Sequence, residues 1–165
     1  MRKLSTFVEG AALALVDIAS ADVLELTYDT RKKSRFKAEL KTGEQVGVML
    51  PRGRVLRGGD ILADEHGAYV CIVAAAECLS RVVSDDPRLL MRAAYHLGNR
   101  HLPLQVGAGC LAYQHDHVLD AMVRGLGLKV DTEEASFEPE EGAYAAHSQS
   151  GAKSHDDNHN HDHNH

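Results

Sequence analysis

Hydrophobic and polar residues alternate along the first half of the chain in short runs. Two segments show this two-residue period, namely 24–28 and 35–40. The tetrapeptide KTGE at 41–44 fits a hairpin turn that connects the second of them to a strand at 45–50. A stretch rich in turn residues follows at 51–62, and the apolar run at 68–76 predicts a buried strand. The pattern therefore predicts a small all-β domain over residues 1–75.

Beyond Glu77 the strands begin to alternate with helices. The run 78–84 is strand-like, Asp86 and Pro87 are typical of a helix cap and first residue, and Gly98 is a typical stop. The apolar residues between them fall on one face of a helix, namely Leu89, Leu90, Ala93, Ala94 and Leu97. This periodicity predicts a helix that packs one side against a core.

The segment after this helix repeats the alternation. Two short strands are expected near 102–106 and 110–113, a second helix at about 116–124, and a last strand at 128–130. The resulting order, β-α-β-β-α-β, is that of the ferredoxin-like arrangement. The chain is therefore predicted to be an α+β protein whose second domain, residues 76–145, is ferredoxin-like.

Hydrophobic periodicity ends at about Asp131, where Gly, Ser, Asn, Asp, Glu and His take over. Such a composition buries too little apolar surface to offset the entropy of ordering the chain. We therefore expect this part to be mobile, with a disordered His-rich tail over 146–165.

The charge of the chain is unevenly distributed. The formal net charge is -6, but the residues from Asp131 onward hold much of the acid, and basic residues cluster within the body. The clusters are Arg31, Lys32, Lys33, Arg35 and Lys37, and then Arg52, Arg54 and Arg57. The chain has no Trp and few other aromatic residues to stack bases, so we expect a solvated strand face or a patch for an acidic protein partner, and no nucleic-acid partner.

The cysteines and the N-terminal residues indicate in which cellular compartment the protein is expected. Cys71, Cys78 and Cys110 are odd in number and form no CxxC pair, which favours a reducing compartment over a disulfide framework. The first residues mimic a secretory signal, but Glu9 and Asp17 interrupt their apolar region. No apolar run approaches the length of a membrane span, so we expect a cytoplasmic protein without a membrane partner.

Histidines dominate the end of the chain. Those of the tail are His147, His155, His159, His161, His163 and His165. Their neutral imidazole nitrogens suit nickel, copper or zinc, and flexible x-H-x-H spacing lets neighbours converge on one ion. Because Asn and Asp alternate with them, unlike the plain run of a purification tag, the tail is interpreted as a native metal-binding arm; a merely polar, titratable tail is the alternative.

Four histidines in the body are further candidate ligands. His96 lies in the last turn of the first predicted helix, where an isolated histidine is adequately explained by its favourable interaction with the helix dipole. His101, just after that turn, is a candidate secondary ligand. His115 and His117 flank Asp116 at the start of the second helix, and such a pair can bind one ion, although HxH pairs also arise by chance on surfaces.

The motifs of several enzyme classes are missing from the sequence. There is no GxxxxGK[ST] phosphate loop, no HExxH helix and no GxSxG elbow. No residue near the histidines is an obvious general base for a metal-bound water. We therefore expect a protein that is not an enzyme.

Longer stretches resemble a known family. These are AAYHLGNRHLPLQV, YQHDHVLDAMVRGLGLKV, FEPEEGAY and LTYDTRKKSRFKAELKTGEQVGVMLPRGRVLRGGDIL. Together they resemble the UreE family of urease accessory proteins, which are nickel metallochaperones, over about residues 20–145. The resemblance implies a β-rich partner- or peptide-binding domain and a ferredoxin-like domain that forms a homodimer. It also implies that His96 binds nickel together with the same residue of the second subunit, and that His115 and His117 match a secondary site found in some members.

The resemblance further implies a function. The chain would deliver Ni(II), its cargo, for assembly of the urease active site, together with the urease apoprotein and accessory proteins that include the urease GTPase. The tail would be an auxiliary reservoir. Cu(II) and Zn(II) are expected competitors, because copper binds imidazole more tightly than nickel does.

Two other functions fit the same residues. In a metal storage or detoxification protein, the His-rich tail would do most of the binding and no specific handover would occur. In an adaptor, the β domain and its basic clusters would matter most and the metal would be incidental. Storage predicts a high metal stoichiometry that disappears with the tail, whereas delivery predicts about one tight ion per dimer that survives its removal.

Overall fold

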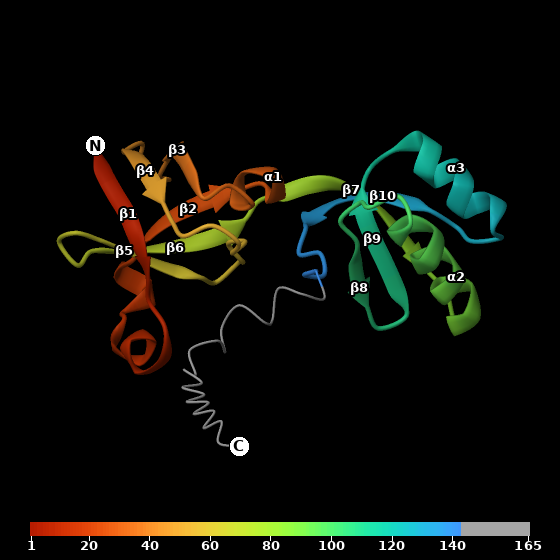
Figure 1. Cartoon of the computed structure of the whole chain (residues 1–165), viewed down its shortest axis with the longest axis horizontal. Helices are drawn as coiled ribbons and strands as arrows, with labels where there is room; N and C mark the ends of the chain where they lie inside the picture. Colours follow the sequence, from red (N-terminus) through yellow and green to blue (C-terminus); the bar gives the residue numbers. More distant parts are fainter. Residues whose placement is uncertain (143–165) are drawn as a thin grey trace, which may run out of the picture.

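A computed structural model describes residues 1–142, which form two β-sheets joined by one short link (Figure 1). The six strands of the first sheet are β1 (Arg2–Phe7), β2 (Asp22–Leu26), β3 (Arg35–Glu39), β4 (Gln45–Met49), β5 (Ile61–Asp64) and β6 (Tyr69–Ala74). The four strands of the second are β7 (Ala76–Val83), β8 (Gln105–Gly107), β9 (Cys110–Gln114) and β10 (Asp131–Ser136). Two helices accompany the second sheet, α2 (Pro87–Gly98) and α3 (His117–Gly125). The chain is thus a two-domain α+β protein.

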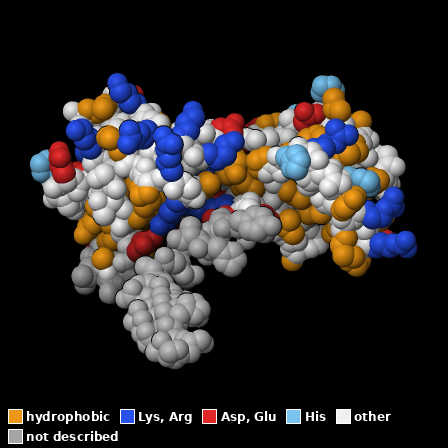
Figure 2. Space-filling view, viewed as in Figure 1, with side chains coloured by type: hydrophobic (Ala, Val, Ile, Leu, Met, Phe, Trp, Pro, Cys, Tyr) orange, Lys and Arg blue, Asp and Glu red, His pale blue; other side chains and the backbone are white. Residues whose placement is uncertain are grey.

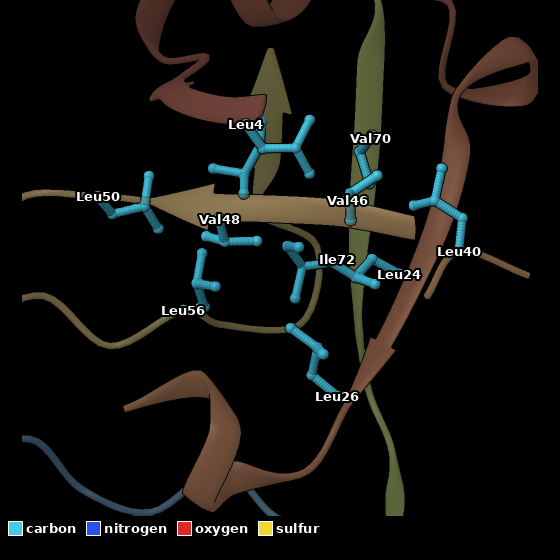
Figure 3. Close-up of a cluster of buried hydrophobic side chains, with 11 residues drawn as sticks. Leu4, Leu24, Leu26, Leu40, Val46, Val48, Leu50, Leu56, Val70 and Ile72 are labelled. Atoms are coloured by element: carbon cyan, nitrogen blue, oxygen red, sulfur yellow. The ribbon is translucent and has the colours of Figure 1, made fainter. Parts of the chain in front are cut away.

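The first sheet has the strand order β2-β6-β5-β1-β4-β3. Strand β1 pairs in parallel with β4, β2 pairs in parallel with β6, and the remaining neighbours are antiparallel. Its core consists of aliphatic side chains, drawn in Figure 3, which include Leu4, Leu24, Val46, Val48 and Ile72. The alternation seen in the sequence directs these side chains to one side of the sheet.

Strand β1 was not anticipated from the sequence. Residues 2–7 lie between β5 and β4, and Leu4 is fully buried in the core. The segment begins with basic residues and precedes an alanine-rich stretch, so its pattern resembles a secretory signal more than a strand. Its long-range pairing with β4, about forty residues away in the chain, decides its structure.

Short helical turns interrupt the first domain, which makes it strand-rich and not all-β. They are η1 (Gly10–Leu15), η2 (Ile18–Ser20) and α1 (Tyr28–Arg31). Tyr28, expected at the end of a strand, begins α1 instead. The other expected strands of this domain appear as β2, β3, β4 and β6, with Gly43 in the left-handed conformation of the β3–β4 turn, whereas β5 begins inside the segment 51–62 that is expected to form turns.

Both helices of the second domain begin as their sequences predict. The Asp86 carboxylate accepts hydrogen bonds from the backbone N–H of Arg88 at 2.8 Å and of Leu89 at 3.3 Å, which caps α2. Ala93 and Leu97 of this helix pack into a core with Val82, Leu111, Tyr113 and Val123. The two helices cover one face of the sheet (Figure 1). Within residues 1–142, no helix is long and apolar enough to cross a membrane.

The end of the second domain differs from the prediction. Residues 128–130 are not a strand, although Leu128 and Val130 are buried in the core. The last strand is β10, which pairs with β7 from Asp131 opposite Arg81 to Ser136 opposite Ala76. Phe137 behind it is fully buried. The segment expected to be mobile from Asp131 is therefore ordered as far as these residues, because an edge strand can be held by backbone pairing with few apolar side chains.

The strand expected near 102–106 is the edge strand β8, which begins later than expected, at Gln105. The sheet has the order β10-β7-β9-β8, and each adjacent pair is antiparallel. The elements follow one another as β-α-β-β-α-β.

A single residue, Ala75, separates β6 from β7 and so links the two sheets. A small cluster of buried side chains lies at this joint, namely Tyr28, Leu79, Ala112 and Phe137. The Tyr28 and Phe137 rings meet edge to face with centroids 5.3 Å apart. Tyr28 belongs to the first domain and Phe137 follows the last strand of the second, so this contact joins the two domains.

Arg31 lies at the same joint and is fully buried, which corrects the expectation that the cluster from Arg31 to Lys37 is a solvated face. Its guanidinium donates hydrogen bonds to the backbone carbonyls of Leu26, Leu56 and Phe137 and to the carboxylate of Glu138. The other four basic residues of the cluster are not buried: Lys32, Lys33, Arg35 and Lys37. A buried arginine is therefore part of the joint between the domains.

Candidate metal site

His96 is exposed in the last turn of α2. Ala93 and Leu97 on neighbouring positions point into the core and so fix the helix orientation. The ring of His96 lies edge to face with that of Tyr95, with centroids 5.4 Å apart. Tyr95 and Met91, one helical turn apart, are 67% and 65% exposed, so the imidazole lies beside an apolar patch on the surface.

His101 is exposed in the turn that follows α2. Its backbone has φ of 56°, in the left-handed region, and its N–H donates to the carbonyl of Gly98 at 2.9 Å. Gly98 is the last residue of the helix, as expected, but the left-handed position falls three residues later. Histidine is one of the few non-glycine residues enriched in this conformation.

His115 is held by a buried carboxylate and a hydroxyl. Its Nδ1 lies 3.0 Å from Ser80 Oγ and 3.4 Å from Asp120 Oδ2, while its side chain remains 40% exposed. Asp120 is 2% exposed and approaches from the first turns of α3. A carboxylate facing Nδ1 favours a proton on that nitrogen, which leaves Nε2 as the free, lone-pair-bearing atom.

Tyr113 fixes the other oxygen of this carboxylate. Its hydroxyl donates to Asp120 Oδ1 at 2.9 Å from the buried strand β9. Burial and this hydrogen bond raise the pKa of Tyr113 far above its ordinary value, so the hydroxyl keeps its proton and remains a donor. Asp120 Oδ2 is thereby directed to His115, with Arg124 3.8 Å away on the same oxygen.

Asp116 caps α3 and does not orient an imidazole. Its Oδ1 accepts hydrogen bonds from the N–H of Val118 at 2.7 Å and of Leu119 at 3.1 Å. These backbone hydrogen bonds, from Leu119 and Val118, hold the pKa of Asp116 below its ordinary value. His117 is the first residue of the helix and is exposed. The pair His115 and His117 thus lies on either side of a cap that fixes the backbone between them.

The contacts that position His115 are not predicted from the sequence. Ser80, Tyr113 and Asp120 come from β7, β9 and α3 and meet only in the folded domain. One local signal existed: Asp120 shares the inward face of its helix with Val123, where a charged residue is unusual. An acidic residue at such a position requires a partner, and here the partners include a candidate metal ligand.

Most of the histidines visible in Figure 2 lie over the second domain, next to hydrophobic side chains, whereas His66 lies on the first domain. Within residues 1–142, no group of three His, Cys, Asp or Glu side chains lies close enough to hold a metal ion. The predicted tail ligands lie outside the described residues, and so does the predicted tail itself, 146–165; these ligands are His147, His155, His159, His161, His163 and His165.

Comparison with known proteins covers nearly the whole chain. Residues 8–75 match the family model for the N-terminal domain of the UreE urease accessory protein, and residues 77–165 match that for its C-terminal domain. A urease accessory protein UreE of Pseudomonas putida (strain W619) is 58% identical over 120 residues, which cover 72% of this chain and 74% of the relative. That of Alkalilimnicola ehrlichii is 56% identical over 131 residues, 79% of this chain and 80% of the relative. That of Proteus mirabilis is 56% identical over 119 residues, 72% of this chain and 74% of the relative.

Proposed function

This chain belongs to the UreE family of urease accessory proteins, and we propose that within urease maturation it carries Ni(II) to the urease active site. The observation that supports nickel carriage best is the exposed imidazole of His96 beside the apolar patch of Met91 and Tyr95. An exposed nitrogen ligand binds a borderline metal ion and remains accessible to a receiving protein.

We propose that the chain acts as a homodimer through this patch. Two large apolar side chains with about two thirds of their surface exposed favour burial against another surface. A two-fold axis at such a patch brings the same residue of both subunits together, so each subunit would contribute His96 to one shared ion. The site would then be incomplete in the monomer.

The proposed domain architecture follows from the same family. The strand order β10-β7-β9-β8 with antiparallel neighbours supports a ferredoxin-like second domain, since its central and edge strands follow the split β-α-β pattern. The first domain would bind protein partners. These would be the urease apoprotein and accessory proteins that include the urease GTPase. The chain would act in the cytoplasm, and it would not itself be an enzyme.

The other histidines would supply nickel ions to the site that the two His96 residues share. His115 and His117 form an exposed pair, with His101 as a further candidate, and the tail carries a dense series of imidazoles. Ligands tethered to the same chain raise the local concentration of the ion near His96 without new contacts. Copper and zinc would compete for these nitrogens, so the choice of nickel would depend on availability and on the partners.

Removing the tail tests delivery against storage. We expect a chain that ends at Ala146 to keep one tight nickel ion per dimer and to lose the weaker ions. Titration calorimetry measures the stoichiometry, and light scattering of the same samples measures the mass. Loss of all tight binding in this shortened chain would favour the storage function instead.

Replacing Asp120 with asparagine tests the peripheral pair. In a tail-less chain, Asp120→Asn should weaken binding at His115 and His117 by roughly 10–100-fold, the usual cost of losing a partner that orients a ligand. The tight site at His96 should be unchanged. Nitrogen NMR of the His115 ring provides a second readout, because the variant should lose the preference for a proton on Nδ1. Unchanged ring signals and unchanged weak binding would show that Asp120 does not position His115.

A further inference from the structure

Gly47 leaves a gap in the outer surface of the first sheet. Val46 and Val48 on either side of it are fully buried in the core, so position 47 faces the opposite side of the sheet, where Gly47 is itself buried next to the flexible end of Met1. The strand register places Gly47 between Lys3 of β1 and Lys37 of β3, and places Met49 beside Arg35 in the neighbouring row. Because glycine has no side chain, the outer face of these three strands lacks one at position 47.

The gap is part of an open groove of about 330 Å³. Its lining residues are Met1, Lys3, Arg35, Phe36, Lys37, Gly47, Val48 and Met49. Met1 and Met49 are 68% and 45% exposed, and the methyl end of Met1 lies 3.0 Å from where a Cβ of residue 47 would be. Flexible methionines beside a backbone floor form a surface that adapts to an apolar side chain.

In the part of the chain that the structure describes, the cations around this groove lack acidic partners. None of the eight lining residues is acidic, and within residues 1–142 no ion pair involves Lys3, Arg35 or Lys37. By contrast, Arg2 on the same strand contacts both Asp22 and Asp64. Figure 2 shows Lys and Arg side chains gathered over β3 and β4 with hydrophobic atoms between them. The groove thus combines an apolar floor with an unneutralised positive rim.

We propose that this groove binds an acidic segment of a partner protein, which inserts one large apolar side chain over Gly47 while its carboxylates meet Lys3, Arg35 and Lys37. Oppositely charged rims steer association, and a buried apolar anchor supplies most of the affinity. A nucleic acid fits less well, because Phe36 is half-buried and the groove offers no exposed aromatic face for a base. The proposal rests on the partner-binding role proposed for the first domain, and because this surface lies on the other domain from the histidines, its test is independent of metal binding.

Selection from a random peptide library displayed on phage, against the full chain in the presence of a chelator, identifies the occupant. We expect the enriched peptides to carry several Asp or Glu residues around one Leu, Ile, Phe or Met. A synthetic copy of the leading peptide, labelled with fluorescein, then measures the affinity of each variant by fluorescence anisotropy.

The decisive variant is Gly47→Val. Valine suits a strand, and its nearest contact is the flexible end of Met1, so the fold should be retained while the gap is filled. We expect the peptide to bind this variant about tenfold more weakly or worse, as for loss of one buried apolar side chain. Lys3→Gln combined with Lys37→Gln should weaken binding and flatten its salt dependence. Lys129→Gln, which removes one positive charge from an exposed residue of the other domain, is the control for each single lysine substitution and should have no effect.

Several results would overturn the proposal. One is a library that yields no enrichment, or enriched peptides without acidic residues. Another is unchanged peptide affinity in Gly47→Val, provided that circular dichroism shows the variant folded. A thymidine oligonucleotide that displaces the peptide and depends on the same lysines would assign the groove to nucleic acid instead.

Discussion

Replacing His96 with alanine should abolish the tight nickel site and leave the protein folded. The imidazole is exposed, and alanine is the strongest helix former, so the free energy of unfolding should change by no more than about 0.5 kcal/mol. In a dimer the substitution removes two ligands at once. Residues that merely orient a ligand are worth roughly 10–100-fold in metal affinity, so loss of the ligands themselves should cost more.

The measurement is nickel titration calorimetry on tail-less chains, with mass from light scattering. His66→Ala is the matched control, because it removes an exposed imidazole from the other domain. The control should retain one tight ion per dimer, and His96→Ala should retain none while remaining dimeric. Tight binding at full stoichiometry in His96→Ala would remove this residue from the site, and a monomeric His96→Ala would mean that it also holds the interface.

The parts of the fold that the sequence predicts best are those set by local chemistry. Asp86 followed by Pro87 starts α2, and Asp116 starts α3, because each cap bonds backbone N–H groups only two or three residues away. Strands β2 and β3 likewise follow from alternating side chains, β4 from the turn that precedes it and β6 from an apolar run, whereas β5 is not predicted. Such signals do not depend on where the rest of the chain lies.

The elements that the sequence does not predict are held by distant partners. Strand β10 has a polar sequence, and its structure depends on pairing with β7 some fifty residues earlier. Strand β1 pairs with β4 and β5, and its apolar content near Leu4 is too low to distinguish it from a leader segment. In both cases the stabilising hydrogen bonds involve the backbone, which leaves little trace in the residue pattern.

In the candidate site, too, local features are predicted from the sequence and contacts between distant residues are not. The pair around Asp116 is visible in the sequence because its members are neighbours, whereas the Ser80 and Asp120 contacts behind His115 require three elements to meet. His96 has no local feature that distinguishes it from a histidine favoured by the helix dipole. Its interpretation as a ligand comes from family resemblance, since a ligand shared across a two-fold axis has no second ligand nearby in the sequence.

The joint between the domains is built around one buried guanidinium. Arg31 Nη1 lies 2.9 Å from the carbonyl of Leu56 and 3.1 Å from Glu138 Oε1, and Nη2 bonds the carbonyl of Phe137. Leu56 belongs to the first domain, and Phe137 and Glu138 follow the last strand of the second. A neutral side chain at position 31 would leave these acceptors buried without a donor, which costs more than the net gain of an ordinary hydrogen bond.

Arg31→Met should therefore destabilise the protein by about 3 kcal/mol or more at neutral pH, although methionine keeps the apolar stem. Urea denaturation followed by circular dichroism measures the change. Arg81→Met is the matched control, because Arg81 pairs with Glu133 on the exposed surface at 3.4 Å, and its loss should cost no more than about 1 kcal/mol. A cost for Arg31→Met as small as that of the control would mean that the guanidinium does not hold the joint.

The pH dependence of this difference tests whether Glu138 is the coupled partner. Burial alone would raise the pKa of Glu138, but hydrogen bonds from the Gly58 N–H and Arg57, together with the charge of Arg31, hold it below 4.5. A carboxyl whose pKa is lower in the folded state stabilises the fold above its unfolded pKa, and this contribution is lost as the pH falls through the folded pKa. In Arg31→Met the pKa of Glu138 is lowered less, so protonation of Glu138 in acid costs the variant less stability than it costs the wild type. The stability difference between the wild type and Arg31→Met should narrow below pH 4.5, whereas a constant difference would show that Arg31 acts only through the backbone carbonyls.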